Sequence, residues 1–134
     1  MTPAQLTPFQ RQYLHLKQQT DENTLLLVRI GDFYEMFFDD ARRAAPLLGL
    51  ALSHRAGAPM CGIPYYCIDT YLARIVHAGM KAALADTMES QPRPGALPRR
   101  EITRVIGYDG TDLWDCHGRV LETVPAKYGS RWIP

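Results

Sequence analysis

The chain has 134 residues, of which 46% are hydrophobic and 22% are charged, a composition typical of one globular domain and not of a disordered tail. Its formal net charge of +1 neither requires nor excludes a nucleic-acid partner, so only local patches of charge could attract one. The sequence has no apolar run of the length that crosses a bilayer, and its first residues lack the basic and then apolar order of a secretory signal. These features predict a cytoplasmic location and no membrane partner.

The three cysteines predict neither a disulfide framework nor a metal site. Cys61 and Cys67 are six residues apart and Cys116 adjoins His117, so no CxxC pair is present and the spacing does not suit zinc. We therefore expect reduced thiols, as is usual in the cytoplasm, and neither a bound metal nor another cofactor.

The chain begins with a helix signal that is followed by a buried strand. Thr7 suits the N-cap position, Pro8 the first helical position, and Gln10 the reciprocal position of a capping box. Apolar residues recur at helical spacing and are expected to pack inward; they are Phe9, Tyr13 and Leu16. Residues 20–23 end this helix with turn chemistry, and the continuous apolar run of residues 24–30, T-L-L-L-V-R-I, predicts a buried strand.

A second helix is expected directly after Gly31, which breaks the strand. Asp32 suits its N-cap position and Glu35 lies three residues later, again with the spacing of a capping box. The helical pattern continues through F-F-D-D-A-R-R-A-A until Pro46 disrupts it.

The rest of the chain is expected to contain strands, loops and one more helix. Residues 50–55 predict a short strand, and residues 55–64, with closely spaced glycines and prolines, predict a loop. Residues 68–78 predict a helix with one apolar face, for which Gly79 suits the C-terminal cap. The remaining predictions are a strand over 81–87, an exposed turn over 90–98, a strand over 100–106 and a β-hairpin over 112–124. The predicted fold is a single α/β (α+β) domain in which about three helices surround a mixed β-sheet.

Phe33 and Glu35 are the strongest candidates for a functional site, because an aromatic side chain at the end of an element can project beyond the core. An apolar wedge can enter the minor groove of DNA and unstack a base step, at a cost that is lowest where pairing is already weak. A carboxylate beside the wedge would repel phosphates, but it could accept a hydrogen bond from a base N–H or take up a proton on meeting a base nitrogen. The alternative is structural: Phe33 packs under a neighbouring loop and Glu35 only completes a helix cap.

Several motifs together resemble the N-terminal mismatch-recognition domain, domain I, of the MutS family of DNA mismatch-repair proteins. The central motif is G-D-F-Y-E-M-F-F-D-D-A, which is preceded by L-L-L-V-R-I. Further matching segments are T-P-F-Q-R-Q-Y-L-H-L-K, M-C-G-I-P-Y-Y and Y-L-A-R-I-V-H-A-G, and the likeness ends near R-E-I-T-R-V-I. The resemblance therefore covers residues 7–106, with separated motifs in the right order.

This resemblance implies a mixed β-sheet surrounded by helices and gives roles to two residues. The family's F-x-E motif falls on Phe33 and Glu35, so Phe33 would stack on the mispaired base and Glu35 would hydrogen-bond to it. The implied partner is double-stranded DNA with a mismatch or distortion, bound weakly by so small a module, and a mismatch-repair protein is a second candidate partner. A chain bound to DNA in this way would be associated with the nucleoid.

Some segments depart from the family pattern. Tyr66 stands where the family usually has histidine, and A-D-T at residues 85–87 replaces the usual C-E-Q. After Ile106 the family continues into a connector domain, whereas this chain continues with G-Y-D-G-T-D-L-W-D-C-H-G. The 134 residues contain no G-x-x-x-x-G-K-[ST] phosphate loop, so we expect a stand-alone recognition module without an ATPase.

Contacts to the DNA backbone would come from local basic residues. The candidates are Arg74, Lys81, Arg99 and Arg100, drawn from a wider set that also includes Arg29, Arg55 and Arg93. Arg99 and Arg100 are favoured within this set because they are adjacent and lie next to an exposed loop, although for each basic residue taken alone an ordinary solvated charge is the favoured alternative.

An enzymatic function is not expected, and no residue is a catalytic candidate. The acidic residues nearest the F-x-E motif could hold magnesium for a nuclease; they are Asp32, Glu35, Asp39 and Asp40. The same residues would also suit the first turns of a helix, where carboxylates complement the helix dipole.

Two functions therefore remain open. In the first, residues 1–106 form a domain that recognises mispaired DNA through Phe33 and Glu35. In the second, the same fold contacts a repair protein or another partner without binding DNA itself. The docking surface would then be the C-terminal hairpin extension, residues 107–134, which we expect to pack on the same domain. Its apolar residues are Leu113, Trp114, Val120, Leu121 and Trp132.

Overall fold

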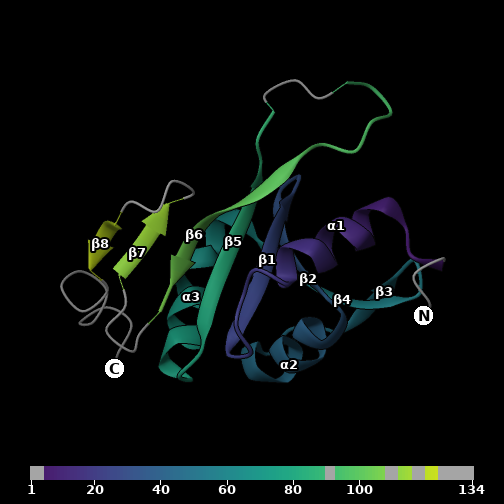
Figure 1. Cartoon of the computed structure of the whole chain (residues 1–134). Coiled ribbons are helices and arrows are strands. Elements are labelled where there is room, and N and C mark those ends of the chain that lie inside the picture. Colours follow the sequence, from purple (N-terminus) through teal and green to yellow (C-terminus); the bar gives the residue numbers. More distant parts are fainter. Residues whose placement is uncertain (1–4, 90–92, 108–111, 116–119, 124–134) are drawn as a thin grey trace.

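The computed structural model describes residues 5–89 and 93–107 with their side chains, and the backbone of residues 112–115 and 120–123. The described strands form one mixed eight-stranded sheet with the order β3-β4-β2-β1-β5-β6-β7-β8 (Figure 1). The β1–β5 pair is parallel, and the other neighbouring strands are antiparallel. The strands are β1 (Thr24–Ile30), β2 (Phe33–Phe37), β3 (Ser53–Arg55), β4 (Ala58–Pro64), β5 (Lys81–Thr87), β6 (Arg100–Ile106), β7 (Asp112–Asp115) and β8 (Val120–Thr123).

Helices cover both faces of the sheet. One face packs against α1 (Pro8–Lys17), and the other packs against α2 (Phe38–Leu48) and α3 (Ile68–His77), which follows a short 3₁₀ turn, η2 (Tyr65–Cys67) (Figure 1). The central strand β1 serves both layers: Leu25 and Leu27 pack on the side of α2 and α3, whereas Leu26 and Val28 pack on the side of α1. Because both faces are covered, β1 is apolar at successive positions and does not alternate. The predicted mixed sheet with three helices is confirmed.

The first helix is held by the capping box that its sequence predicts. The Thr7 hydroxyl accepts from the backbone N–H of Gln10 at 3.1 Å, and the Gln10 side chain accepts from the N–H of Thr7 at 2.9 Å. Two of the helix's first unpaired N–H groups are thereby satisfied. Tyr13 and Leu16 are buried against the sheet, and the partly buried Phe9 packs against the same core cluster, as expected.

The prediction of a helix that begins at Asp32 is wrong. Residues 31 and 32 instead form the two-residue loop of a β-hairpin, in which Ile30 of β1 pairs with Phe33 of β2. Gly31 has φ +57°, a left-handed conformation that glycine adopts at no steric cost. A Gly-Asp pair between two apolar runs is itself a hairpin signal, and here it outweighs the capping spacing of Asp32 and Glu35.

Two further predictions are corrected nearby. The helix begins only at Phe38 and continues through Pro46 to Leu48. Proline removes one N–H donor in the last turn, but the packing of the helix's buried alanines on the sheet stabilises the helix by more than this loss costs. Gly49, with φ +68°, then ends it. Residues 58–64, interpreted as part of a loop, form the strand β4, whose pairing with β2 and β3 overrides their glycine and proline content.

The remaining elements lie close to their predicted positions. The strand of residues 50–55 shortens to β3, and the predictions for α3, β5 and β6 are confirmed. β7 pairs with β6 and β8 with β7, so the C-terminal hairpin extends the sheet. The side chains proposed for a docking surface there lie outside the described residues, and the division at residue 106 stays a prediction. Within the described part of the chain, no helix is long and apolar enough to cross a membrane.

Candidate nucleic-acid interface

Phe33 stands at one end of the sheet with its ring partly in solvent. It is the first residue of β2, next to the two-residue loop, and it pairs with Ile30 on one side and Pro64 on the other. Its exposed fraction of 44% places it among the exposed large apolar residues, whereas the next four residues of β2 are buried. The hairpin therefore exposes one aromatic side chain at its tip, and the residues of β2 that follow it are buried in the core.

Glu35 points to the same face of the sheet as Phe33 because the two residues are two positions apart on a strand. That face is the one covered by α1, since Phe37, two positions further, packs against α1. Opposite Glu35 on β4 lies Gly62. A Cβ atom added at Gly62 would lie 3.6 Å from both Phe33 Cδ1 and Glu35 Cγ, so the two side chains flank the bare backbone of this glycine.

The carboxylate of Glu35 is buried and carries one charged partner. Its side chain is only 6% exposed, and Arg55 Nη1 donates to Glu35 Oε1 at 2.5 Å. Burial raises the pKa of Glu35 above its ordinary value of 4.5, and the positive charges of Arg55 and Arg100 oppose that rise. Within the described part of the chain, Oε2 makes no hydrogen bond. The carboxylate is thus bound by Arg55 at one oxygen, and no described residue binds the other.

Arg100 reaches the same end of the molecule from a distant part of the sequence. It opens β6 and pairs with Thr87 at the end of β5, which runs parallel to β1. Its Nη1 donates to Gln12 Oε1 at 2.9 Å, and its guanidinium carbon lies 5.4 Å from the centre of the Phe9 ring. The helix α1 therefore orients a guanidinium whose charge acts on Glu35.

The other predicted basic residues occupy different surfaces. Arg74 lies on α3, behind the opposite face of the sheet, where it donates to Leu48 O at 3.2 Å. Lys81 begins β5, at the far end from Phe33, and forms an ion pair of 2.8 Å with Asp21. Arg99 is exposed and precedes β6 at the Phe33 end. The structure thus gathers Phe33, Glu35 and the Arg99–Arg100 pair, but not Arg74 or Lys81.

Sequence reasoning undervalued several neighbours of Phe33. Arg55 belonged only to the wider set of basic candidates, and the adjacent Tyr65 and Tyr66 were used only as part of the family motif, with no role at the site. Tyr66 is 77% exposed, and the Arg29 guanidinium lies 4.2 Å from the centre of the Tyr65 ring. Tyr65 N–H donates to Asp32 O at 2.8 Å, which joins this turn to the hairpin tip. The signal available in the sequence was the adjacent pair of tyrosines after a proline.

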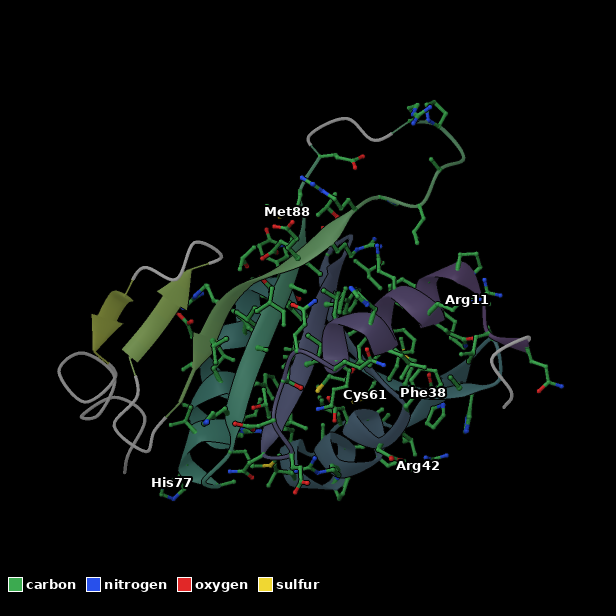
Figure 2. All side chains as sticks on the ribbon, viewed as in Figure 1. Arg11, Phe38, Arg42, Cys61, His77 and Met88 are labelled. Atoms are coloured by element: carbon green, nitrogen blue, oxygen red, sulfur yellow. The ribbon has the colours of Figure 1, made fainter. Side chains whose placement is uncertain are left out.

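The acidic residues near the motif do not form a metal site. Asp40 is buried, accepts from Leu26 N–H at 2.8 Å and pairs with Lys17 at 3.0 Å, whereas Asp39 pairs on the surface with Arg42. Among the described residues, no three or more histidine, cysteine, aspartate or glutamate side chains are grouped to hold a metal ion. Figure 2 shows Cys61 inside the molecule and Arg42 on its surface, and Cys61 is a free thiol.

Known proteins are similar to this chain over most of its length. A family model described as MutS domain I matches residues 7–111. A protein named DNA mismatch repair protein MutS, from Thermotoga neapolitana, is 46% identical over 101 residues, which are 75% of this chain and 12% of that protein. The MutS of Synechococcus sp. (strain JA-2-3B'a(2-13)) is 50% identical over 111 residues, 79% of this chain and 12% of that protein. The MutS of Pseudothermotoga lettingae is 43% identical over 110 residues, 82% of this chain and 13% of that protein. The chain thus spans only 12% to 13% of these relatives' length.

Proposed function

Because the chain belongs to the MutS domain I family, we propose that it binds duplex DNA at mispaired or distorted positions without catalysing a reaction on it. The observation that carries this proposal is the pairing of a half-exposed phenyl ring, Phe33, with a buried carboxylate, Glu35, on one face of one strand. Its partner is DNA with a defective base pair, bound weakly, and a mismatch-repair protein is a further partner. The expected location is the cytoplasm, and the nucleoid when DNA is bound.

Phe33 acts as the wedge. An exposed phenyl ring is costly in water, and stacking on a base removes that cost while it opens the base step. The step opens most easily where pairing is already weak, so the wedge favours a mismatch over a matched pair. The hairpin supports this use because Phe33 is at its tip and the residues that follow are fixed in the core.

Glu35 acts as the acceptor that reads the displaced base. With Oε1 engaged by Arg55, Oε2 can accept a hydrogen bond from a base N–H. The raised pKa also allows Glu35 to take up a proton and donate to a base nitrogen instead. Either bond costs little reorganisation, because Arg55 already holds the carboxylate in place.

The test compares duplexes that differ by one base pair. Fluorescence anisotropy at low salt is measured on a G·T duplex and on its matched homoduplex, with wild type, Phe33→Ala and Leu47→Ala. Leu47 is a matched control, because it is 39% exposed but lies on α2. We expect wild type and Leu47→Ala to bind the G·T duplex more tightly than the matched duplex. In Phe33→Ala the ratio of the two affinities should fall about tenfold, which corresponds to the loss of one aromatic–base stack. Equal binding of both duplexes by wild type would contradict the proposal and favour the protein-interaction function.

A further inference from the structure

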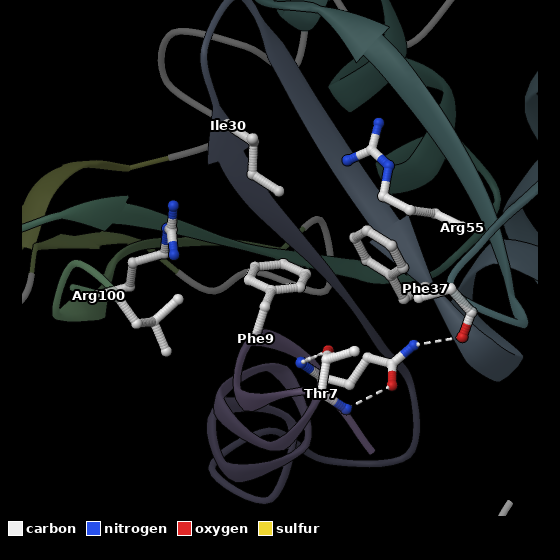
Figure 3. Close-up of a pocket in the computed structure, with 9 residues that line it drawn as sticks. Thr7, Phe9, Ile30, Phe37, Arg55 and Arg100 are labelled. Carbon is white, nitrogen blue, oxygen red and sulfur yellow. Dashed lines mark hydrogen bonds between the residues drawn. The ribbon is translucent and has the colours of Figure 1, made fainter. Parts of the chain in front are cut away.

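The tip of the β1–β2 hairpin borders open space on the face of the sheet where Phe33 points. Gly31, Asp32 and Phe33 are all exposed. Ile30, which pairs with Phe33, lines a cavity of about 300 Å³ on the α1 face of the sheet (Figure 3). A wedge carried by so exposed a loop loses conformational entropy when it enters a base stack, unless contacts elsewhere already hold it in place.

Arg29 supplies such contacts from the opposite face of the sheet. It pairs with Tyr34 across the hairpin, and Tyr34 packs on the side of α2 and α3. Arg29 Nε donates to Gly31 O at 2.5 Å, which ties this side chain to the loop. Its guanidinium carbon lies 4.2 Å from the centre of the Tyr65 ring and 5.7 Å from the centre of the Tyr34 ring, distances at which a cation is attracted to an aromatic face. One side chain therefore links the loop to two aromatic rings.

Tyr65 adds a second link to the same loop. It begins the η2 turn, directly after β4. Its backbone N–H donates to Asp32 O at 2.8 Å. The carbonyl oxygens of both loop residues therefore accept hydrogen bonds, Gly31 O from Arg29 and Asp32 O from Tyr65. Neither bond uses the Phe33 ring, so the backbone of the tip is restrained while the ring stays free for a base.

We propose that Arg29 is a positioning residue for mismatch recognition. Stacked on Tyr65 and bonded to Gly31 O, it orders the hairpin tip before DNA binds, so that Phe33 enters the base stack in a fixed orientation. This inference rests on the proposed function, and it adds a residue that acts on the wedge without touching the base. The entropy of ordering the tip is then lost during folding and not during binding. Discrimination increases, because the wedge enters a defective pair more easily than a matched pair.

A direct phosphate contact is the alternative role for Arg29, which makes no ion pair with a described residue. Its side chain is half-buried, its Nε is bonded to Gly31 O and its guanidinium is stacked close to Tyr65, and all three observations favour positioning. A planar guanidinium can stack and donate at once, and a lysine ammonium cannot reproduce this arrangement. The two roles therefore make different predictions for Arg29→Lys.

Anisotropy titrations separate the two roles. Wild type, Arg29→Lys and Arg29→Gln are titrated with a G·T duplex and with its matched homoduplex at several salt concentrations. We expect both variants to lose about tenfold in the ratio of the two affinities, which corresponds to the entropy of ordering one residue, while the salt slope on matched DNA stays unchanged. If Arg29→Lys kept the preference and Arg29→Gln reduced the slope by about one unit, the inference would be overturned and Arg29 would be assigned to a phosphate.

Variants of Tyr65 test the stacked ring. Tyr65→Leu removes the ring and should lose as much preference as Arg29→Lys, whereas Tyr65→Phe keeps the ring and should retain the wild-type preference. Tyr71→Leu is the matched control, because the Arg74 guanidinium carbon lies 5.1 Å from the centre of the Tyr71 ring in a contact of the same kind on α3. Loss of preference in Tyr65→Phe would show that the hydroxyl itself contacts DNA, and would overturn the positioning role.

The backbone order of the free chain gives a readout that does not depend on DNA. Nitrogen-15 relaxation at Gly31, Asp32 and Phe33 is measured in wild type, Arg29→Lys and Tyr71→Leu. We expect increased nanosecond mobility at these three residues in Arg29→Lys alone, with the resonances of the core unchanged. Equal order in all three proteins would overturn the inference and leave the wedge proposal standing. Equal binding of both duplexes by wild type would overturn the proposed function and this inference with it.

Discussion

The two ends of the parallel pair β1–β5 differ in how many of their charged and apolar side chains are covered or paired within the chain. At the end where both strands begin, Lys81 pairs with Asp21 at 2.8 Å, and the Asn23 side chain donates to Gly79 O at 2.6 Å. At the other end, Phe33 and Leu97 are exposed, and Arg100 makes no ion pair with a described residue. The first end is closed by contacts within the chain, and the second leaves apolar surface and charge for a partner.

This difference shows why position in the sheet matters more than residue type. Lys81 and Arg100 are both cations at the end of a strand, but Lys81 forms a direct ion pair with Asp21, whereas Arg100 donates to the neutral Gln12 amide and interacts with the Glu35 charge without a direct ion pair among the described residues. A cation that is paired internally gains less from a phosphate, because the existing ion pair must first be broken. We therefore place DNA at the Phe33 end.

The largest expected effect is on the salt dependence of DNA binding. Arg100→Gln should reduce the slope of log affinity against log salt concentration by about one unit, because one phosphate contact is lost. Lys81→Gln and Arg74→Gln should leave the slope unchanged, since neither residue lies at the Phe33 end. Anisotropy titrations between low and physiological salt measure the slopes. If Lys81→Gln reduced the slope and Arg100→Gln left it unchanged, DNA would bind at the Lys81 end and not at the Phe33 end.

The next effect is on stability. Arg55→Ala leaves the buried carboxylate of Glu35 without its partner and should lower the free energy of unfolding by about 1 kcal/mol at neutral pH, a modest value because the guanidinium is half exposed. Arg42→Ala is the control, because its pair with Asp39 is fully on the surface. Urea denaturation measures both variants. The double variant Arg55→Ala/Glu35→Gln should recover stability, and equal losses in the single and double variants would show that the buried charge is not the cause.

A smaller effect concerns pH. The pKa of Glu35 is raised in the folded state, so its contribution to stability is present below the ordinary value of 4.5 and is lost as pH rises through the folded value. The free energy of unfolding of wild type relative to Glu35→Gln should therefore fall as pH increases above 4.5. Urea denaturation of both proteins across this range gives the difference. A rise with pH would mean that Arg55 and Arg100 outweigh the burial of the carboxylate.

The smallest effect is expected at the closed end. Lys81 lowers the pKa of Asp21 to about 2, so this carboxylate contributes stability above its ordinary value of 3.8 and loses it as pH falls through about 2. Because the Asp21 side chain is more than half exposed, Asp21→Asn should cost no more than about 1 kcal/mol at neutral pH. DNA affinity should not change, and a clear decrease in anisotropy titrations would show that the closed end also contacts DNA.

The local features of the fold could be predicted from the sequence. The capping box of Thr7 and Gln10, the buried run of β1 and the helix α3 depend on neighbouring residues, and all are present. Phe33 and Glu35 were singled out by their motif, but the secondary structure predicted for them was wrong. Asp32 and Glu35 have the spacing of a capping box in a helix, and only pairing with β1 and β4 shows that they belong to a hairpin.

The sequence by itself determined the family and the mixed sheet with its helices, because these depend on short motifs and periodicity, and the roles of Phe33 and Glu35 stay predictions from the same motifs. Only the tertiary structure decided which charges surround that pair. Arg55 meets Glu35 across 20 positions of the chain, and Arg100 meets Gln12 across 88. Contacts at such separations depend on strand order and register, which the spacing of residues along the chain does not encode, and the same register places Lys81 at the opposite end.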